Sequence, residues 1–190
     1  MNDNEELPLG GKTLRFINAP FLHWPDTIFT YLVEDKILFP CDFLGSHYSS
    51  PHTFNDELDQ PEKARKAFEF YYSTIMRPYK EPILKACERL KDLPISIIAP
   101  SHGPVLRKNP LEYVAWYKDR ADIMARVKEK KVPIVYVSAY GNTAAMAKKV
   151  AEGVAAGGLT PVLLNGVEVP IDRIVDELDE SVGFLIGTPT

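Results

Sequence analysis

The sequence places Phe21-Leu22-His23-Trp24-Pro25-Asp26 before, and Cys41-Asp42-Phe43-Leu44-Gly45-Ser46-His47 after, two short runs of β-branched and aromatic residues. These runs cover residues 28–34 and 37–39 and are joined by Asp35-Lys36, so they predict two strands connected by a tight turn. Antiparallel pairing returns the chain to its starting edge, which brings the residue before the first strand close to the residue after the second. We therefore expect the His23 imidazole and the Asp42 carboxylate at the same end of one sheet.

A third polar side chain follows a later apolar run. Residues 95–99 predict another short strand, which leads into Pro100-Ser101-His102-Gly103. Imidazole and carboxylate groups at strand ends suit iron, zinc or manganese, and one carboxylate can bridge two ions. The same positions are also typical of histidines that are merely hydrogen-bonded in loops, and the spacing leaves both interpretations open.

The last third of the sequence has a different pattern. Residues 132–137 are almost continuously apolar, as expected for the buried centre of a parallel sheet. They lead into a small polar loop, residues 138–143, and then into a helix. Unpaired backbone N–H groups at a helix start bind phosphate, and the hydroxyls of Ser138 and Thr143 would add donors. The loop has neither a Walker lysine nor a G-x-G-x-x-G string, which argues against ATP and against a dinucleotide.

Taken together, these strings resemble the flavodiiron proteins, also called A-type flavoproteins. The resemblance rests on A-P-F-L-H-W-P-D, C-D-F-L-G-S-H and A-P-S-H-G-P, followed by S-x-Y-G-N-T, in the order of that family and over nearly the whole chain. It implies that His23 ligates one iron ion, that Asp42 bridges both ions, and that His102 ligates the other. It also makes His47 and Tyr48 candidates for catalytic pocket residues.

The resemblance further implies the fold and the flavin site. The expected α/β chain contains the C-terminal half of a metallo-β-lactamase-like αββα sandwich at residues 1–128. The first three strands of a flavodoxin-like doubly wound parallel sheet follow at residues 132–190. The H-x-E-x-D-H string of the family is absent from the sequence, so we expect a piece of a longer protein. The residues implied in FMN binding are Ser138, Ala139, Tyr140, Gly141, Asn142, Thr143, Thr188, Pro189 and Thr190.

The function implied by the resemblance is that of an oxidoreductase. FMN would take electrons from a small donor, such as rubredoxin or a flavin reductase, and two iron ions would reduce dioxygen to water or nitric oxide to nitrous oxide. A homodimer or higher oligomer is expected for the complete protein. Two alternatives remain: a zinc-dependent hydrolase of the metallo-β-lactamase-like superfamily, and a truncated fragment without catalytic activity.

Composition excludes several other classes. The chain has 190 residues, 45% of them hydrophobic and 25% charged, which is typical of a globular protein. A formal net charge of -4 without a clustered basic face argues against nucleic-acid binding. Cys41 and Cys87 form no disulfide or thiolate-metal pattern, and no apolar run approaches the roughly 18 residues of a membrane span. Without a signal peptide, a cytoplasmic location is expected.

Helical patterns connect these parts. Apolar residues recur at helical spacing over 61–76 and 80–91, and Asn109-Pro110 predicts an N-cap and first turn of a helix that continues to about Val127. In the helix after the polar loop, Met146, Val150 and Val154 are expected to form the core stripe. The many aromatic residues of 68–79 predict packing in a core, and Cys87 is expected to be buried.

Overall fold

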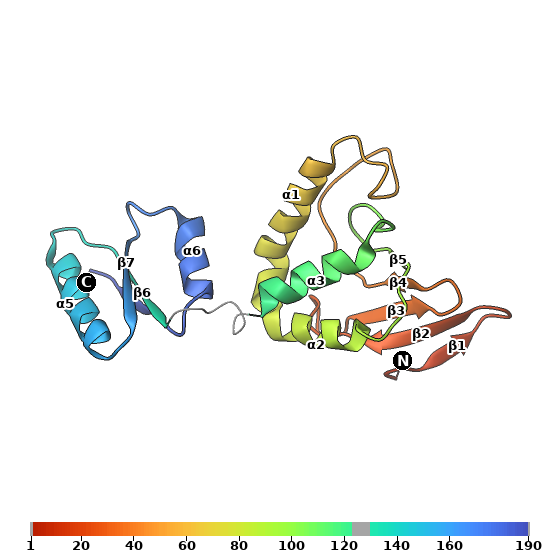
Figure 1. Ribbon diagram of the computed structural model, residues 1–190, viewed down its shortest axis with the longest axis horizontal. Helices are drawn as coiled ribbons and strands as arrows, with labels where there is room; N and C mark the ends of the chain where they lie inside the picture. The colour runs from red at the N-terminus through yellow and green to blue at the C-terminus, as the bar shows by residue number, and fades with distance from the viewer. Residues whose placement is uncertain (1, 123–129, 190) are drawn as a thin grey trace. The chain divides into compact units, whose positions relative to one another are not determined.

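A computed structural model of the chain describes residues 2–122 and 130–189. The chain divides into two compact units, Met1–Asp122 and Ile123–Thr190, which are described separately below (Figure 1). The expected domain boundary between residues 128 and 132 adjoins the undescribed residues, so it stays a prediction. The expected helix end near Val127 lies outside the described residues as well.

The first unit contains one mixed sheet, in which each strand neighbours the next in sequence. The order is β1-β2-β3-β4-β5, with antiparallel pairs throughout except for the parallel pair of β4 and β5. Because β3 runs against β4 while β5 runs with it, the start of β3 and the ends of β4 and β5 share one edge. The strands are β1 (Glu6–Pro8), β2 (Thr13–Asn18), β3 (Ile28–Leu32), β4 (Ile37–Phe39) and β5 (Ile97–Ile98).

Helices pack against one face of this sheet. They are α1 (Pro61–Tyr71), which continues through a π-helical turn (Tyr72–Met76) and a 3-10 turn (Arg77–Tyr79), then α2 (Lys80–Leu90) and α3 (Pro110–Ala121). Asn109 is the N-cap residue of α3 and Pro110 opens the helix, as predicted, but Asn109 has a left-handed backbone with φ of 53°. The side-chain amide of Asn109 donates to Oε1 of Glu112 at 2.8 Å. The Asn109 side chain accepts no hydrogen bond from a backbone N–H of the helix.

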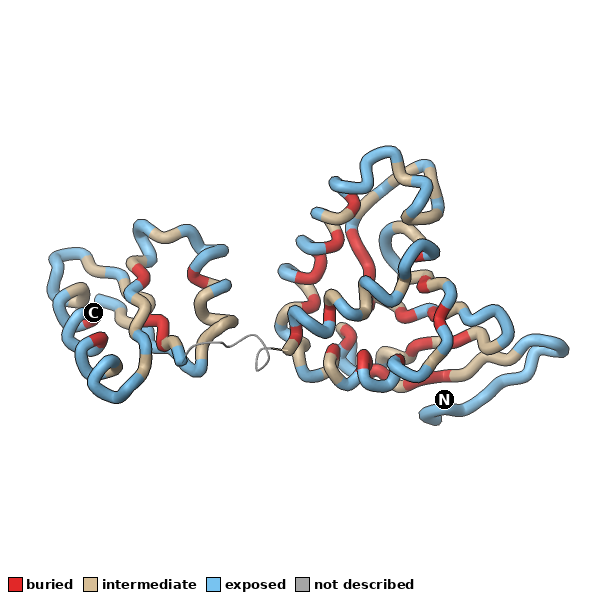
Figure 2. Tube along the Cα trace, in the orientation of Figure 1, coloured by how far each residue is buried: buried red, intermediate tan, exposed pale blue. Residues whose placement is uncertain are grey.

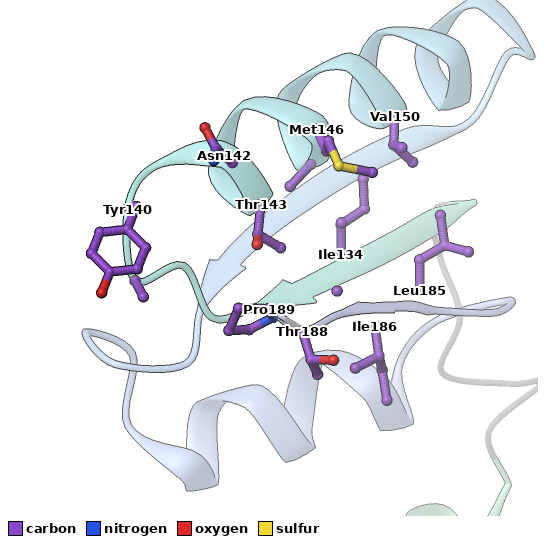
Figure 3. Close-up of a pocket in the computed structure, with 13 residues that line it drawn as sticks. Ile134, Tyr140, Asn142, Thr143, Met146, Val150, Leu185, Ile186, Thr188 and Pro189 are labelled. Carbon is purple, nitrogen blue, oxygen red and sulfur yellow. The ribbon is translucent and has the colours of Figure 1, made fainter.

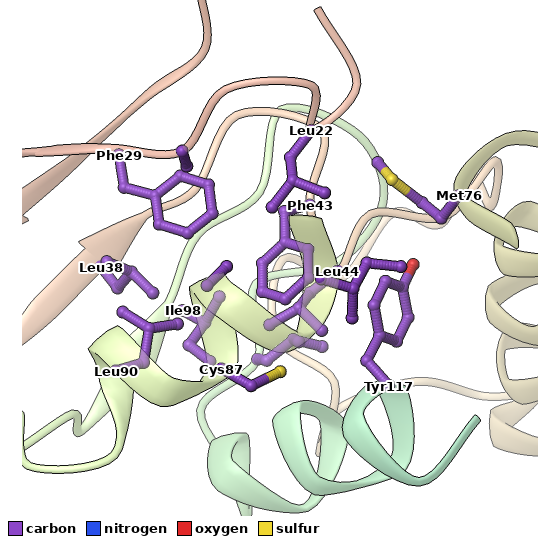
Figure 4. Packing of buried hydrophobic residues seen from close by; sticks show 14 of the residues in the cluster. Leu22, Phe29, Leu38, Phe43, Leu44, Met76, Cys87, Leu90, Ile98 and Tyr117 are labelled. Carbon is purple, nitrogen blue, oxygen red and sulfur yellow. The ribbon is translucent and has the colours of Figure 1, made fainter. Parts of the chain in front are cut away.

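The core of the first unit lies between the sheet and these helices (Figure 4). Alternate residues of β3, Phe29 and Tyr31, are buried toward the helices, as the two-residue period of a strand requires. Phe43 and Tyr117 meet edge to face with ring centroids 5.2 Å apart, which joins the segment after β4 to α3. Cys87 is buried among these side chains, as predicted.

The second unit is a three-stranded parallel sheet with two helices. The strands have the order β7-β6-β8, so the apolar strand β6 is central, as the sequence predicted. The elements are β6 (Lys131–Tyr136), α5 (Asn142–Ala156), β7 (Thr160–Asn165), α6 (Ile171–Asp179) and β8 (Leu185–Gly187). No helix within the described ranges combines the length and apolar character needed to cross a bilayer.

The predicted core stripe of α5 is wrong for Met146 and Val150, whereas Val154 packs against the core as predicted. Met146 is 68% exposed and Val150 is 42% exposed, whereas Ala147 and Ala151 are buried. Figure 2 shows that most of α5 is exposed. Successive helix residues are about 100° apart, so the buried face is turned by one residue from the expected stripe. Small alanine side chains make the contact with the sheet, and the larger side chains at 146 and 150 border a pocket.

Candidate metal centre and phosphate-binding loop

Asp42 lies between two imidazole rings at the shared edge of the first sheet. Nε2 of His23 is 3.4 Å from Oδ2 of Asp42, and Nε2 of His102 is 3.3 Å from Oδ1. Each imidazole therefore faces a different oxygen of the same carboxylate. All three side chains are partly exposed, so the cluster is open to solvent and to ligands. The structure brings together the three residues that the sequence placed at strand ends.

Backbone hydrogen bonds hold the two loops of this cluster against each other. The Ser46 N–H donates to the carbonyl oxygen of His102 at 3.1 Å, and the Ser101 N–H donates to that of Cys41 at 2.8 Å. A Cβ atom on Gly45 would lie 3.0 Å from the carbonyl oxygen of Asp42 and 3.3 Å from that of His102. The close approach of the loops thus depends on a glycine at this position.

A group of rings surrounds the carboxylate. His47 contacts Tyr71 and His102 with ring centroids 4.9 and 5.5 Å apart, and Tyr71 is 6.3 Å from His102. Burial and the nearby charge of Asp42 raise the pKa of Tyr71 to about 12, so its phenol stays protonated at neutral pH. The sequence missed Tyr71, because its place in an apolar helical stripe indicated only core packing.

Other residues of the region lie at the rim. The His23 ring is 5.8 Å from the ring of Trp24 and 6.2 Å from that of Tyr79. Trp24 is 64% exposed. The hydroxyl of Tyr48 donates to the carbonyl oxygen of Gln60 at 3.5 Å, a long hydrogen bond. Tyr48 also lines a hollow of about 320 Å³ together with residues 49–53 and 103–105.

The donor set can be compared with the needs of a metal ion. Within residues 2–122 and 130–189, no group of three or more His, Cys, Asp or Glu side chains forms a ready metal-binding cluster. Asp42 offers instead one oxygen to each of two separate imidazoles, and nitrogen and oxygen donors of this kind fit iron, zinc or manganese. The neighbouring Cys41 thiol donates to the carbonyl oxygen of Ile28 at 3.3 Å. Burial and Asp42 raise the pKa of this thiol, which disfavours the thiolate form that binds metals.

The second unit has its own site, at the start of α5. Gly141 precedes the helix with φ of 87°, a left-handed conformation that favours glycine. Oγ of Ser138 accepts a hydrogen bond from the N–H of Ala144 at 3.2 Å, which leaves its own proton free to donate. Tyr140 is 95% exposed at the tip of the loop.

A pocket of about 680 Å³ adjoins this loop (Figure 3). Ala139, Tyr140, Asn142 and Thr143 line it from one loop, and Thr188 and Pro189 line it from the segment after β8. Thr190 lies outside the described residues. The sequence missed the apolar side of the pocket, which consists of Ile134, Met146, Ala147, Val150, Leu185 and Ile186. A polar helix start beside an apolar wall suits a ligand with a phosphate and a flat ring system, and the volume is ordinary for cofactor sites.

Both units of the chain match known protein families. Residues 1–103 match the family model described as ODP family beta lactamase, and residues 134–190 match the flavodoxin model. The flavo-diiron protein FprA2 of Clostridium acetobutylicum is 38% identical over 98% of this chain and 48% of its own length. The anaerobic nitric oxide reductase flavorubredoxin of Aeromonas hydrophila is 35% identical over 98% of this chain and 38% of its own length.

Solved structures give the same relationship. The flavodiiron protein from Giardia intestinalis aligns with a TM-score of 0.64 and 32% identity over 100% of this chain and 46% of its own. The rubredoxin oxygen:oxidoreductase from Desulfovibrio gigas aligns with a TM-score of 0.64 and 27% identity over 100% of this chain and 47% of its own. The chain spans about half the length of these relatives. With a beta-lactamase domain of the ODP family and a flavodoxin domain in this order, the chain belongs to the flavodiiron proteins.

Proposed function

We propose that the chain contributes a bridged di-iron site and an FMN site to an enzyme that reduces dioxygen to water or nitric oxide to nitrous oxide. The observation that carries this proposal is the position of Asp42, whose two oxygens face the imidazoles of His23 and His102. A pair of metal ions needs a ligand that reaches both, and a carboxylate with one imidazole at each oxygen has that form. The printed names of the relatives, nitric oxide reductase and rubredoxin oxygen:oxidoreductase, support these substrates.

The side chains around the carboxylate have distinct tasks in this proposal. His23, His102 and Asp42 would hold the iron ions. An iron pair bound there would supply the electrons that a small gaseous substrate takes up at one place. Tyr71 keeps its proton and offers an O–H group beside the cluster, while His47 packs between Tyr71 and His102. Tyr48 is assigned to the outer pocket, where its hydroxyl meets Gln60.

The second unit holds FMN in the same proposal. The N–H groups at the start of α5 and the hydroxyls of Ser138 and Thr143 bind the phosphate. Ala139, Tyr140, Gly141 and Asn142 shape the loop, and Thr188 and Pro189 line the pocket where the ring system would lie. Thr190 is assigned to the flavin site from the sequence alone. FMN held there would supply one-electron redox chemistry. The apolar wall that includes Met146 excludes water from the flavin ring.

The wider setting of the enzyme belongs to the proposal as well. Relatives named for rubredoxin and for nitric oxide reduction favour a small redox protein, such as rubredoxin or a flavin reductase, as the electron donor. We also propose a cytoplasmic location and a homodimeric or higher assembly of the complete protein. Sedimentation of that protein would test the assembly, and a monomeric species would contradict it.

Metal binding tests the first site directly. The chain is titrated anaerobically with ferrous iron, and bound metal is counted after desalting. Wild type is expected to retain iron, and Asp42→Ala is expected to lose it because the shared ligand is gone. Asp59→Ala is the matched control, since Asp59 is also 3.4 Å from a histidine, His52, but lies outside the cluster. Equal iron retention by Asp42→Ala and wild type would contradict the assignment.

Gas consumption tests the reaction. The complete protein, loaded with iron and FMN, is given reduced rubredoxin, and dioxygen and nitric oxide are followed with electrodes. We expect consumption of one or both gases, and its loss in Asp42→Ala. A chain that retains zinc in preference to iron, binds no flavin and consumes neither gas would instead favour the hydrolase alternative.

A further inference from the structure

A small cavity lies against the two loops that carry Asp42 and His102. Leu44 lines it from the loop that follows Asp42, and Leu106 lines it from the segment that follows His102. The rest of its wall comes from the long loop before α1, from α1 itself and from α3. The cavity is thus next to the candidate metal centre without containing any of its ligands.

The volume of the cavity limits what it can hold. It is about 50 Å³, whereas sites for cofactors and drug-sized ligands have about 300 to 1,000 Å³. One water molecule takes up about 30 Å³ in the liquid, so the space suits one or two molecules of that size. A diatomic gas fits such a space, and a sugar, a peptide or a flavin does not.

The inner end of the cavity is apolar. Leu44, Phe68 and Leu106 line it and are at most 3% exposed, and Ala64 of α1 is 8% exposed. Side chains of this kind form no hydrogen bonds with a guest, and an ordered water molecule needs two to four polar partners. The inner end therefore favours an apolar molecule over water.

Asn55, an amide on the wall, makes its hydrogen bonds with the protein itself. Its Nδ2 donates to the carbonyl oxygen of Lys108 at 2.9 Å and to the hydroxyl of Tyr113 at 3.3 Å. Its Oδ1 accepts from the backbone N–H groups of Arg107 and Lys108, both at 2.9 Å. These four bonds use the full capacity of the amide, so it does not hold water in the cavity.

Arg65 and Ser46 also border the cavity. Nε of Arg65 donates to Oε1 of Glu69 at 2.8 Å, and the guanidinium group lies 5.5 Å from the ring centre of Phe68. The charge is therefore held along α1. Ser46 contributes one hydroxyl, which is fewer polar partners than an ordered water molecule requires.

The cavity reaches the surface near the start of α1. Pro61, the first residue of the helix, lines it and is exposed, and Leu58 lines it and is partly exposed. The buried Leu44 and Leu106 lie at the opposite end. The lining therefore leads from solvent to the loops that carry the cluster.

We propose that this cavity is a binding site for a small apolar gas and that it holds dioxygen or nitric oxide beside the His23–Asp42–His102 cluster. Both gases dissolve better in apolar surroundings than in water, so an apolar cavity concentrates them. Its use as a gas reservoir for the metal site rests on the proposed function, whereas the binding of gas does not.

Xenon is a suitable probe, because this inert atom enters dry apolar cavities. The full chain, without metal or flavin, is equilibrated with xenon at rising pressure, and its methyl groups are followed by proton–carbon NMR. We expect the signals of Leu44, Leu58 and Leu106 to shift and to reach a plateau. The signals of Leu164, which is buried in the second unit, should not shift. Shifts that stay absent, or that grow linearly with pressure in both units, would overturn the site.

Variants of one α1 residue locate the bound gas. Ala64→Leu fills the cavity, so the saturable shifts should disappear. Ala67→Leu is the matched control and should keep them, because Ala67 is on the same helix and partly buried but is not part of the lining. If the NMR spectrum shows that Ala64→Leu is unfolded, Ala64→Val adds less volume and should weaken xenon binding. Saturable shifts of wild-type strength in a folded Ala64 variant would overturn the site.

The reservoir is tested in the complete protein loaded with iron and FMN. Ala64→Leu should raise the KM for the gas and leave kcat unchanged, because it removes a place where gas collects without touching the cluster. Ala67→Leu should leave both constants unchanged. An unchanged KM in Ala64→Leu would overturn the reservoir, whereas a complete protein that consumes no gas would contradict the proposed function and not the xenon site.

Discussion

Gly103 and Ser46 interlock the two loops that carry His102 and Asp42. A Cβ atom on Gly103 would overlap Oγ of Ser46 and lie 2.7 Å from the Ser46 carbonyl oxygen. Gly103 also has φ of 86°, a conformation that residues with a Cβ rarely adopt. Since the Ser46 N–H donates to the carbonyl of His102, the position of one loop fixes that of the other.

Gly103→Ala should therefore destabilise the first unit and weaken metal binding. Left-handed backbone strain and overpacking together cost about 3 kcal/mol. Urea unfolding followed by tryptophan fluorescence measures the loss. Gly10→Ala is the matched control, because Gly10 also has a positive φ, of 68°, but a Cβ there would meet nothing within 4 Å. Gly10→Ala should lower the free energy of unfolding by about 1 kcal/mol, from backbone strain alone. Equal losses in the two variants would contradict the interlock.

Tyr117→Phe should stabilise the first unit. The buried hydroxyl of Tyr117 lies near the backbone of Leu44 but makes no well-aligned hydrogen bond within the described part of the chain, and such a group costs about 1 kcal/mol or more. Tyr31→Phe is the control, since Tyr31 is also a buried residue and its hydroxyl donates to the carbonyl oxygen of Pro94 at 2.6 Å. Tyr31→Phe should lower the free energy of unfolding by about 1 kcal/mol. Chemical denaturation compares both with wild type, and destabilisation of Tyr117→Phe would show that its hydroxyl is satisfied.

Strand direction predicted that His23 and Asp42 share an edge, because two antiparallel strands return the chain to its starting edge. His102 was expected beside them only from the family resemblance, since the parallel pairing of β4 and β5 leaves no signal in the sequence. The sequence did not predict Tyr71, since a residue in a helical stripe gives no sign of which loop it will meet. The stripe of α5 was misjudged for a related reason. Periodicity finds an apolar face, but Ala147 and Ala151, with their short side chains, allow the closest approach to the sheet, and Met146 and Val150 are left to line the pocket.

Alkaline pH should destabilise the first unit through Cys87. Burial raises the pKa of this thiol to about 12, from an ordinary value of 9.0. Above pH 9 the unfolded thiol releases its proton while the folded one keeps it, so the unfolded state binds fewer protons and stability falls as pH rises. The fall reaches about 1.4 kcal/mol between pH 8 and pH 10.

Comparison of wild type with Cys87→Ala isolates the contribution of the Cys87 thiol to the pH dependence of stability. Cys87→Ala is less stable than wild type at pH 8 because a buried group is lost. By pH 10 the gap in free energy of unfolding between the two proteins should narrow, since only wild type loses stability through the thiol. Urea unfolding at each pH measures the gap. Tyrosine ionisation contributes equally to both proteins and cancels. A gap that stays constant from pH 8 to pH 10 would show that the Cys87 thiol ionises as easily in the folded chain as in the unfolded one.

Ser138→Ala should weaken FMN binding and loosen the start of α5. The Ser138 oxygen accepts from the Ala144 N–H at 3.2 Å, so its removal leaves one helix N-terminal donor unpaired and costs the helix about 1 kcal/mol. Loss of the hydroxyl also removes a donor to the phosphate, worth about 1 kcal/mol or roughly a five-fold rise in Kd. Quenching of flavin fluorescence measures the affinity. Ser181→Ala is the control, because its hydroxyl bonds only to the carbonyl oxygen of Leu178, away from the loop. If Ser138→Ala bound FMN as tightly as wild type, the phosphate would have to be held by the backbone N–H groups without that hydroxyl.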